Sequence, residues 1–173
     1  MIRLLLIAAF LAPLGGAGKT LLSRDEALLN AFPEATFRKE TLWPSAELHK
    51  RAEEFAGIPI PEGPVHRWVA EKKGEILGFI YFDRHRVRTL PETLMVGILP
   101  NGTLKGLEVL RFSEPINYMP GPRWYRQFDN RQLDEKLQLK KGISAVTGAT
   151  LTARATVNSS RRTLALHKAL SGQ

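Results

Sequence analysis

The segment with the clearest chemical potential is Thr147-Gly148-Ala149-Thr150-Leu151-Thr152, which stands directly before a long helical pattern. A glycine lets the backbone approach a ligand closely, and the unpaired N–H groups at a helix start carry the positive end of the helix dipole. Such a turn is suited to a phosphate or another anion. The same pattern is also typical of an ordinary helix start, so the spacing by itself leaves both interpretations open.

A second candidate binding segment is the irregular stretch 113–128, where aromatic residues alternate with prolines and arginines. Long loops commonly bind ligands, and aromatic rings stack on flat ligands. Trp124 and Phe128 lie four residues apart, so they also fit a short helix that packs on a sheet. Tyr118 completes the aromatic set, and Arg123 or Arg126 can stabilise a negative charge on a ligand.

Other chemistries find less support in the sequence. Asp134 and Glu135 are adjacent in a polar stretch, and we interpret them as solvated loop charges. A hydrolase with Thr150 or Ser113 as nucleophile lacks a supporting base and a nucleophile-elbow motif. No metal site is expected, because the four histidines fall on different predicted elements without metal-ligand spacing: His49, His66, His85 and His167. These residues therefore do not indicate a stand-alone enzyme.

The elements that must position these segments begin with two helices and a strand. Ser23 and Glu26 form a capping-box pattern, which predicts a helix to about Phe32. A strand is expected over 35–42, and an amphipathic helix is expected from Ser45 to a stop at Gly57. A proline-rich break over 58–64 follows.

Strand patterns then dominate up to Phe112. Residues 65–72 and 75–87 predict a hairpin, and 94–99 and 104–112 predict a second pair joined through Asn101-Gly102. A final helix is expected over 153–170, with small residues on its buried face. The fold class is therefore α+β, an antiparallel meander of about four to six strands packed with a few helices, including a C-terminal helix.

The net charge and the N-terminal segment limit the partners and the cellular compartment that are expected for the protein. The formal net charge of +8 is compatible with nucleic acid, anionic lipid or an anionic cofactor, although a solvated basic surface is the simplest interpretation. Residues 1–17 resemble a secretory signal, which predicts export to the periplasm and argues against nucleic acid. Membrane association is expected only if this segment is retained. We expect 18–64 to pack on a domain over 65–173, without disulfides, because the chain has no cysteine.

The segment Ile143-Ser144-Ala145-Val146-Thr147-Gly148-Ala149-Thr150 resembles the flavinylation motif of the FMN-binding domain of RnfG and NqrC, subunits of membrane redox complexes. The family pattern is an acidic residue, two variable residues, Ser or Thr, Gly, Ala, and a final Thr or Ser. Ser144 stands where the acidic residue is usual. The resemblance extends over about 65–170 and includes the strand pair around Asn101-Gly102 and the Ser113-Glu114-Pro115 loop.

The resemblance implies that FMN is attached to Thr150 through a phosphoester, installed from FAD by a separate flavin transferase. It implies electron transfer between a membrane redox partner and a membrane or periplasmic acceptor. A cofactor-free basic binding or adaptor module of the same fold is the alternative, and Ser144 is the feature in its favour. The residues expected at the cofactor are Thr150, Thr147, Gly148, Ala149, Leu151, Thr152, Glu114, Tyr118, Trp124 and Phe128.

Overall fold

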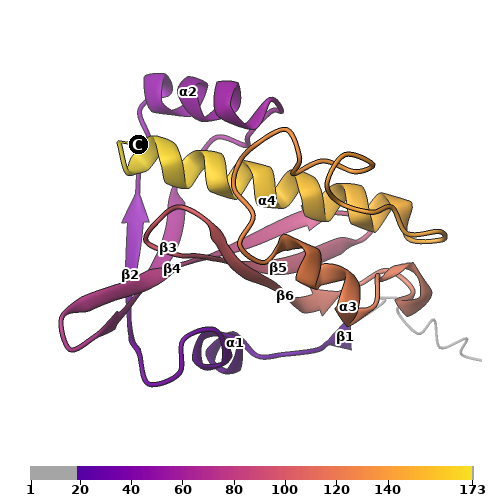
Figure 1. Ribbon diagram of the computed structural model, residues 1–173, viewed down its shortest axis with the longest axis horizontal. Coiled ribbons are helices and arrows are strands. Elements are labelled where there is room, and N and C mark those ends of the chain that lie inside the picture. The colour runs from indigo at the N-terminus through magenta and orange to yellow at the C-terminus, as the bar shows by residue number, and fades with distance from the viewer. Residues whose placement is uncertain (1–18, 173) are drawn as a thin grey trace, which may run out of the picture.

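A single antiparallel sheet forms the centre of the computed structural model, which describes residues 19–172 (Figure 1). The six strands lie in the order β1-β6-β5-β4-β3-β2. The predicted signal over residues 1–17 lies outside the described residues. The strands are β1 (Lys19–Thr20), β2 (Thr36–Leu42), β3 (Val65–Lys72), β4 (Glu75–Arg86), β5 (Pro91–Ile98) and β6 (Leu104–Phe112).

Both predicted hairpins are confirmed. The β3–β4 turn uses Lys73 and Gly74, both with positive φ, as a tight hairpin requires. In the β5–β6 turn, the Asn101 side chain accepts a hydrogen bond from the backbone N–H of Thr103 at 3.1 Å. The prediction for the third strand was wrong at its start, because β5 begins at Pro91, which pairs with Arg86. A proline is tolerated at the first residue of a strand.

The predicted elements before the hairpins are also present. Helix α1 (Arg24–Ala31) has the expected capping box between Ser23 and Glu26. Helix α2 (Ala46–Ala56) starts at an N-cap, Ser45, and ends at Gly57 in the left-handed conformation. Strand β2 pairs with β3 and forms one edge of the sheet.

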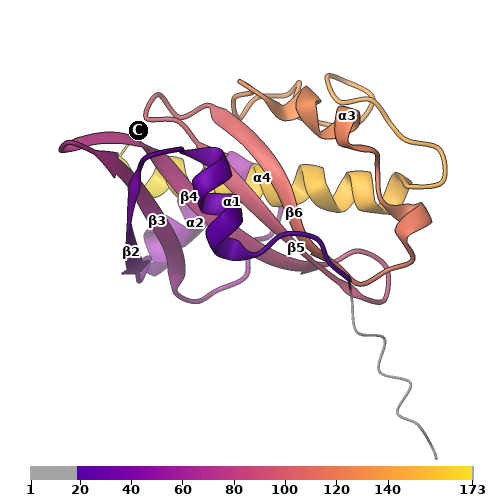
Figure 2. The same ribbon diagram turned by 90° about the horizontal axis from the view of Figure 1, so that it is seen from below.

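Helices cover the two faces of the sheet unequally. Helix α4 (Thr150–Leu170) crosses one face and carries α2 on its outer side, while α1 lies on the opposite face (Figures 1 and 2). Helix α4 begins at Thr150, three residues before the predicted start at Ala153. Its first turn forms because the buried Thr152 hydroxyl is hydrogen-bonded to a neighbouring loop, which offsets the weak helix propensity of threonine.

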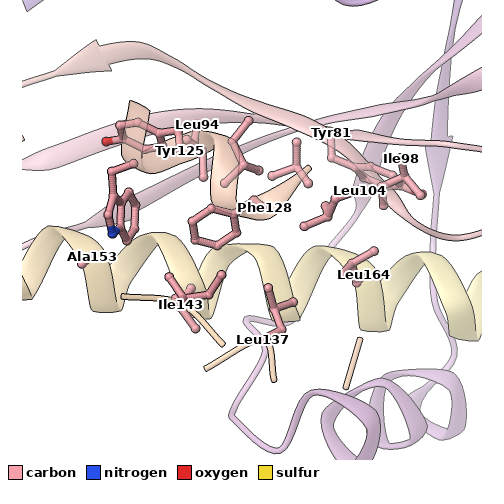
Figure 3. Packing of buried hydrophobic residues seen from close by; sticks show 14 residues of the cluster. Tyr81, Leu94, Ile98, Leu104, Tyr125, Phe128, Leu137, Ile143, Ala153 and Leu164 are labelled. Carbon is pink, nitrogen blue, oxygen red and sulfur yellow. The ribbon is translucent and has the colours of Figure 1, made fainter. Parts of the chain in front are cut away.

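The main core lies between α4 and the sheet (Figure 3). The predicted small-residue face of α4 is confirmed, since Ala153, Val157 and Ser160 are all buried. Short helices α3 (Pro122–Tyr125) and η2 (Arg126–Phe128) close one end of this core. Within residues 19–172, no helix combines the length and the apolar composition that crossing a membrane requires.

Candidate functional site

The turn before α4 has the open geometry that a phosphate site requires. Gly148 adopts φ +82°, and a Cβ placed there would meet no heavy atom within 4 Å. Ala149 is buried and occupies the N-cap position of α4 without a side-chain cap, so no neighbouring side chain takes up the first helical N–H groups from that position. Thr150 is exposed at the first helical position, and its hydroxyl donates to the Val146 carbonyl at 3.2 Å. The turn therefore presents the exposed Thr150 hydroxyl beside the N–H groups of the first helical turn, and Thr147 is exposed three residues earlier.

A hollow of about 160 Å³ opens beside this turn. The Thr152 hydroxyl donates to the Tyr118 carbonyl at 2.5 Å, which ties the 3-10 helix η1 (Ile116–Tyr118) to the start of α4. The Arg88 guanidinium lies 5.3 Å from the centroid of the Tyr118 ring. The hollow thus combines a cation and an aromatic ring with the turn, and its lining residues are Arg88, Tyr118, Gly148, Ala149, Thr150, Leu151 and Thr152.

Glu114 acts on this site through the β4–β5 hairpin. Its carboxylate accepts hydrogen bonds from the backbone N–H groups of Arg88, Thr89 and Leu90, at 3.1, 2.7 and 2.8 Å. Burial would raise the pKa of Glu114, but these three donors outweigh burial and lower the pKa. Glu114 does not line the hollow; it fixes the hairpin that presents Arg88.

Two aromatic residues predicted at the cofactor lie in the core instead of the hollow. Phe128 is fully buried, and Trp124 is 8% exposed. The Trp124 indole N–H donates to the Ser144 carbonyl at 2.7 Å, and the Ser144 N–H donates to the Gln127 side chain at 2.9 Å. These contacts hold the segment that leads into the Thr147 turn. The structure therefore brings Tyr118 to the turn but places Trp124 and Phe128 behind it, as a helix packed on the sheet.

A buried ionic network stands at the base of the same hairpin. His85 contacts the Asp83 and Glu92 carboxylates through its two ring nitrogens, each at 3.0 Å. Arg162 of α4 donates to Asp83 at 2.9 Å. Burial would lower the pKa of His85, but the two carboxylates raise it to about 9. Burial would raise the pKa of Asp83, but its hydrogen bond to His85 and the nearby charges lower it. A charged imidazolium therefore links β4 to β5 just before the turn that carries Arg88.

Sequence analysis missed both Arg88 and this network. Arg88 lies outside the regular strand pattern, and nothing local marks it as a ligand-facing residue. His85 and Glu92 are paired only by the register of β4 and β5. The sequence shows that Asp83 and His85 lie two residues apart and so share one face of the strand. Glu92 is identified as the partner of His85 only when β4 and β5 are aligned.

The remaining candidates have structural partners. His167 is buried, and its Nδ1 lies 2.9 Å from the Tyr81 hydroxyl. Burial, together with the charge of Arg67, lowers the pKa of His167 to about 4. Asp134 accepts backbone hydrogen bonds from Lys136 and Leu137 at 2.8 and 3.0 Å. In the part of the chain that the structure describes, no three His, Asp or Glu side chains gather as metal ligands.

A larger hollow, of about 530 Å³, lies between α1, β6 and α3. Its wall includes the carboxylates of Glu108 and Asp129 beside Lys105 and Arg126. Burial and the neighbouring charge of Asp129 raise the pKa of Glu108. Burial also raises the pKa of Asp129, against the opposing charges of Arg126 and Lys105. The raised pKa values indicate that the surroundings of Glu108 and Asp129 disfavour negative charge. This hollow is therefore a poor site for a phosphate.

Comparison with known proteins gives a match to one protein family and to one curated protein. Residues 90–165 match the family model described as FMN-binding domain, and this span contains the Thr147 turn, Tyr118 and Glu114. The G subunit of the Na⁺-translocating ferredoxin:NAD⁺ oxidoreductase complex of Acetobacterium woodii is 23% identical over 145 residues, covering 74% of this chain and 67% of that protein.

A solved structure gives a further comparison. The crystal structure of Shewanella oneidensis NqrC aligns with a TM-score of 0.49 and 16% identity, covering 76% of this chain and 69% of that one. Residues 90–165 therefore match the FMN-binding domain family, and the redox-complex subunit from A. woodii is a homologue at low identity.

Proposed function

We propose that this chain is an exported electron-transfer protein that carries FMN on Thr150 through a phosphoester. The observation that carries the proposal is the position of Thr150, an exposed hydroxyl at the first residue of α4, within the span that matches the FMN-binding domain. The unpaired N–H groups of the first helical turn favour a phosphate group at this point. Gly148 leaves the space beside it open.

Arg88 is the residue of this chain that best matches the charge of the phosphate. It lines the hollow together with Thr150, and it forms no salt bridge within residues 19–172. A guanidinium can hold a phosphate oxygen with two parallel N–H donors. Glu114 keeps the hairpin in place, so Arg88 reaches the hollow from a fixed backbone.

The hollow is large enough for the phosphate end of the cofactor only. At about 160 Å³ it is below the usual range for small-molecule pockets, roughly 300–1,000 Å³. Leu151, which lines the hollow, is 44% exposed, and Ile116, two residues before Tyr118, is 50% exposed. These apolar side chains, with Tyr118, can cover a flat ring at the surface. When bound, FMN supplies the redox chemistry, and the chain sets its exposure and electrostatic surroundings.

Attachment requires a separate flavin transferase, as the family resemblance implies. The Thr150 oxygen attacks the FMN-side phosphorus of FAD, and the phosphoester bond forms as the pyrophosphate bridge breaks. AMP is the leaving group, and the hydroxyl proton passes to a base of the transferase. In this chain the Thr150 hydroxyl donates a hydrogen bond to the Val146 carbonyl, which favours one rotamer of Thr150.

The partners and the compartment follow from the same proposal. The relative from A. woodii is a subunit of a redox complex, which supports a redox partner in or at a membrane. Residues 1–17 have the basic start and apolar run of an export signal, which supports a location outside the cytoplasm.

Coexpression of the full chain with a flavin transferase tests this function. We expect the purified protein to be yellow and to keep one FMN, minus water, in its intact mass after denaturation. If the flavin dissociated on denaturation, the phosphoester would be ruled out, while non-covalent FMN binding would still stand. A colourless chain of unmodified mass, in cells where the transferase modifies a second substrate, would overturn the proposal in favour of a cofactor-free adaptor. Ser144, in place of the acidic residue of the motif, is the observation that favours that alternative.

A further inference from the structure

Three arginines form a basic surface at one end of the sheet, on the face opposite α4. Arg84 of β4 is paired with Thr93, Thr93 is paired with Arg111 of β6, and Arg111 is paired with Thr20 of β1. Directly paired residues project to the same face of a sheet. Arg86 lies two residues beyond Arg84 on the same strand and so shares that face. We call Arg84, Arg86 and Arg111 the basic sheet end.

Helix α1 leaves this end of the sheet uncovered. It packs on a core cluster that includes Met95 and Leu110, with Phe82 at its edge. All three arginines of the basic sheet end are exposed beyond that cluster. None of them forms a salt bridge with another residue in the range 19–172. The result is a positively charged surface on a rigid sheet.

The carboxylates near this surface do not neutralise it. Asp83 and Glu92 project to the opposite face, where they contact His85. Glu114 is occupied by the backbone of the β4–β5 hairpin. Glu108 pairs with Met95, two residues along β5 from Thr93, so it lies on the same face, and helix α1 on this face carries Asp25 and Glu26 in its first turn. None of these three carboxylates forms a salt bridge with the basic sheet end in the described range 19–172.

The chain enters the described structure at the same place. Strand β1 (Lys19–Thr20) pairs with Arg111 and Phe112, and the sequence just before it holds an apolar run over residues 4–14. The basic sheet end therefore lies beside the strand that closely follows this apolar stretch in the sequence.

From this placement we propose that the basic sheet end binds the surface of a bilayer that contains anionic phospholipid. Guanidinium groups match the phosphate of a lipid headgroup, and each basic residue near an anionic surface strengthens the attraction. The start of α4 and β1 lie at the same end of the molecule in both views (Figures 1 and 2), with α4 on the face of the sheet opposite the three arginines. The lipid surface itself does not depend on the flavin.

Arginine footprinting on the full chain tests this surface without relying on a variant that has to fold. The protein is treated with phenylglyoxal in the presence of vesicles of phosphatidylcholine alone, or of phosphatidylcholine with phosphatidylglycerol, and modification is measured for each arginine by mass spectrometry. We expect modification of Arg84, Arg86 and Arg111 to slow by about threefold or more on the anionic vesicles only, because the lipid phosphates occupy the guanidinium groups. High salt should restore the rate.

Arg51 is the internal control, because it is exposed on α2, on the other side of the molecule. Its rate should stay the same with both kinds of vesicle. Equal protection of Arg51, or no protection of the three arginines on anionic vesicles, would overturn the proposal. Protection that appears only in native membranes with their proteins, and not on protein-free anionic vesicles, would identify an acidic protein as the partner and would also overturn it.

Discussion

The two hollows of this domain differ in size and in chemistry, and the smaller one is the better phosphate site. The larger hollow, about 530 Å³, contains Glu108 and Asp129, whose pKa values are already raised by burial. The smaller one, about 160 Å³, contains an exposed hydroxyl, a helix start and an arginine without a salt bridge in the described range. The smaller hollow is therefore preferred for a phosphate because its wall can stabilise negative charge, although its volume is smaller.

The loop over residues 113–128 contributes residues to both hollows and to the main core. Tyr118, in its first half, lines the smaller hollow, while Tyr125 and Arg126, in its second half, line the larger one. Trp124 and Phe128, on either side of Tyr125 and Arg126 in the sequence, are buried and anchor the loop in the core. Changes in the inward residues should affect stability, and changes in the residues at the hollow should affect flavin loading.

Phe128→Ala should give the largest effect. Removing a fully buried ring in a packed core lowers the free energy of unfolding by about 4 kcal/mol, measured by urea denaturation. Tyr118→Ala, the matched control in the same loop, should lower it by less than about 1 kcal/mol because Tyr118 is only half-buried. Equal losses in the two variants would show that the loop is not anchored as described.

His85→Gln should make stability less dependent on pH. The raised pKa of about 9 means that His85 stabilises the fold fully below its unfolded pKa, about 6.5, and loses this contribution as pH rises through 9. Over that window wild type should lose on the order of 3 kcal/mol, at about 1.4 kcal/mol per pKa unit. Denaturation at several pH values should show that the difference in unfolding free energy between wild type and the variant is largest at pH 6 and smallest at pH 9. A gap that widens with pH would contradict this account.

Arg88→Gln should reduce FMN loading by about tenfold, because the hollow loses its cation; this corresponds to about 1.4 kcal/mol. Arg86→Gln removes the same charge two residues away, outside the hollow, and should leave loading unchanged. Flavin absorbance per chain after coexpression with the transferase measures both. An equal fall in the two variants would indicate a general charge effect instead of a contact at the hollow.

Glu108→Gln should give the smallest effect. It relieves repulsion with Asp129, but solvent screens this exposed pair, so the gain in unfolding free energy should stay below about 0.5 kcal/mol. FMN loading should not change, because Glu108 lines only the larger hollow. A large change in loading would move the cofactor to that hollow and would contradict the choice between the two.

Local patterns predicted most of the fold. The Ser23–Glu26 capping box, the Ser45 cap and the Asn101-Gly102 turn each act over a few residues, so the sequence determines them directly. An antiparallel sheet of about four to six strands and a C-terminal helix were predicted and are present, but the short edge strand β1 was not predicted. The start of α4 was missed because it depends on the contact between Thr152 and the Tyr118 carbonyl, two residues far apart in sequence.

The site was predicted in part for the same reason. Residues 148–152 and Tyr118 line one hollow, whereas Thr147, which was also expected at the cofactor, is exposed outside it. Arg88 was missed, and Glu114 was expected at the cofactor but contacts the hairpin instead, because both placements depend on how β4 and β5 pair. The positions of Arg88 and Glu114 depend on the register of the strands, which the composition of a loop does not reveal.

The most direct test of the central claim is the location of the flavin within the chain. After coexpression with a flavin transferase, trypsin should release the peptide from Gly142 to Arg154, which contains Ser144, Thr147, Thr150 and Thr152. We predict that fragmentation of this peptide places the added mass of FMN, minus water, on Thr150, and that Thr150→Ala abolishes it while Thr147→Ala keeps it. Attachment to Thr147, Thr152 or another peptide would contradict the account.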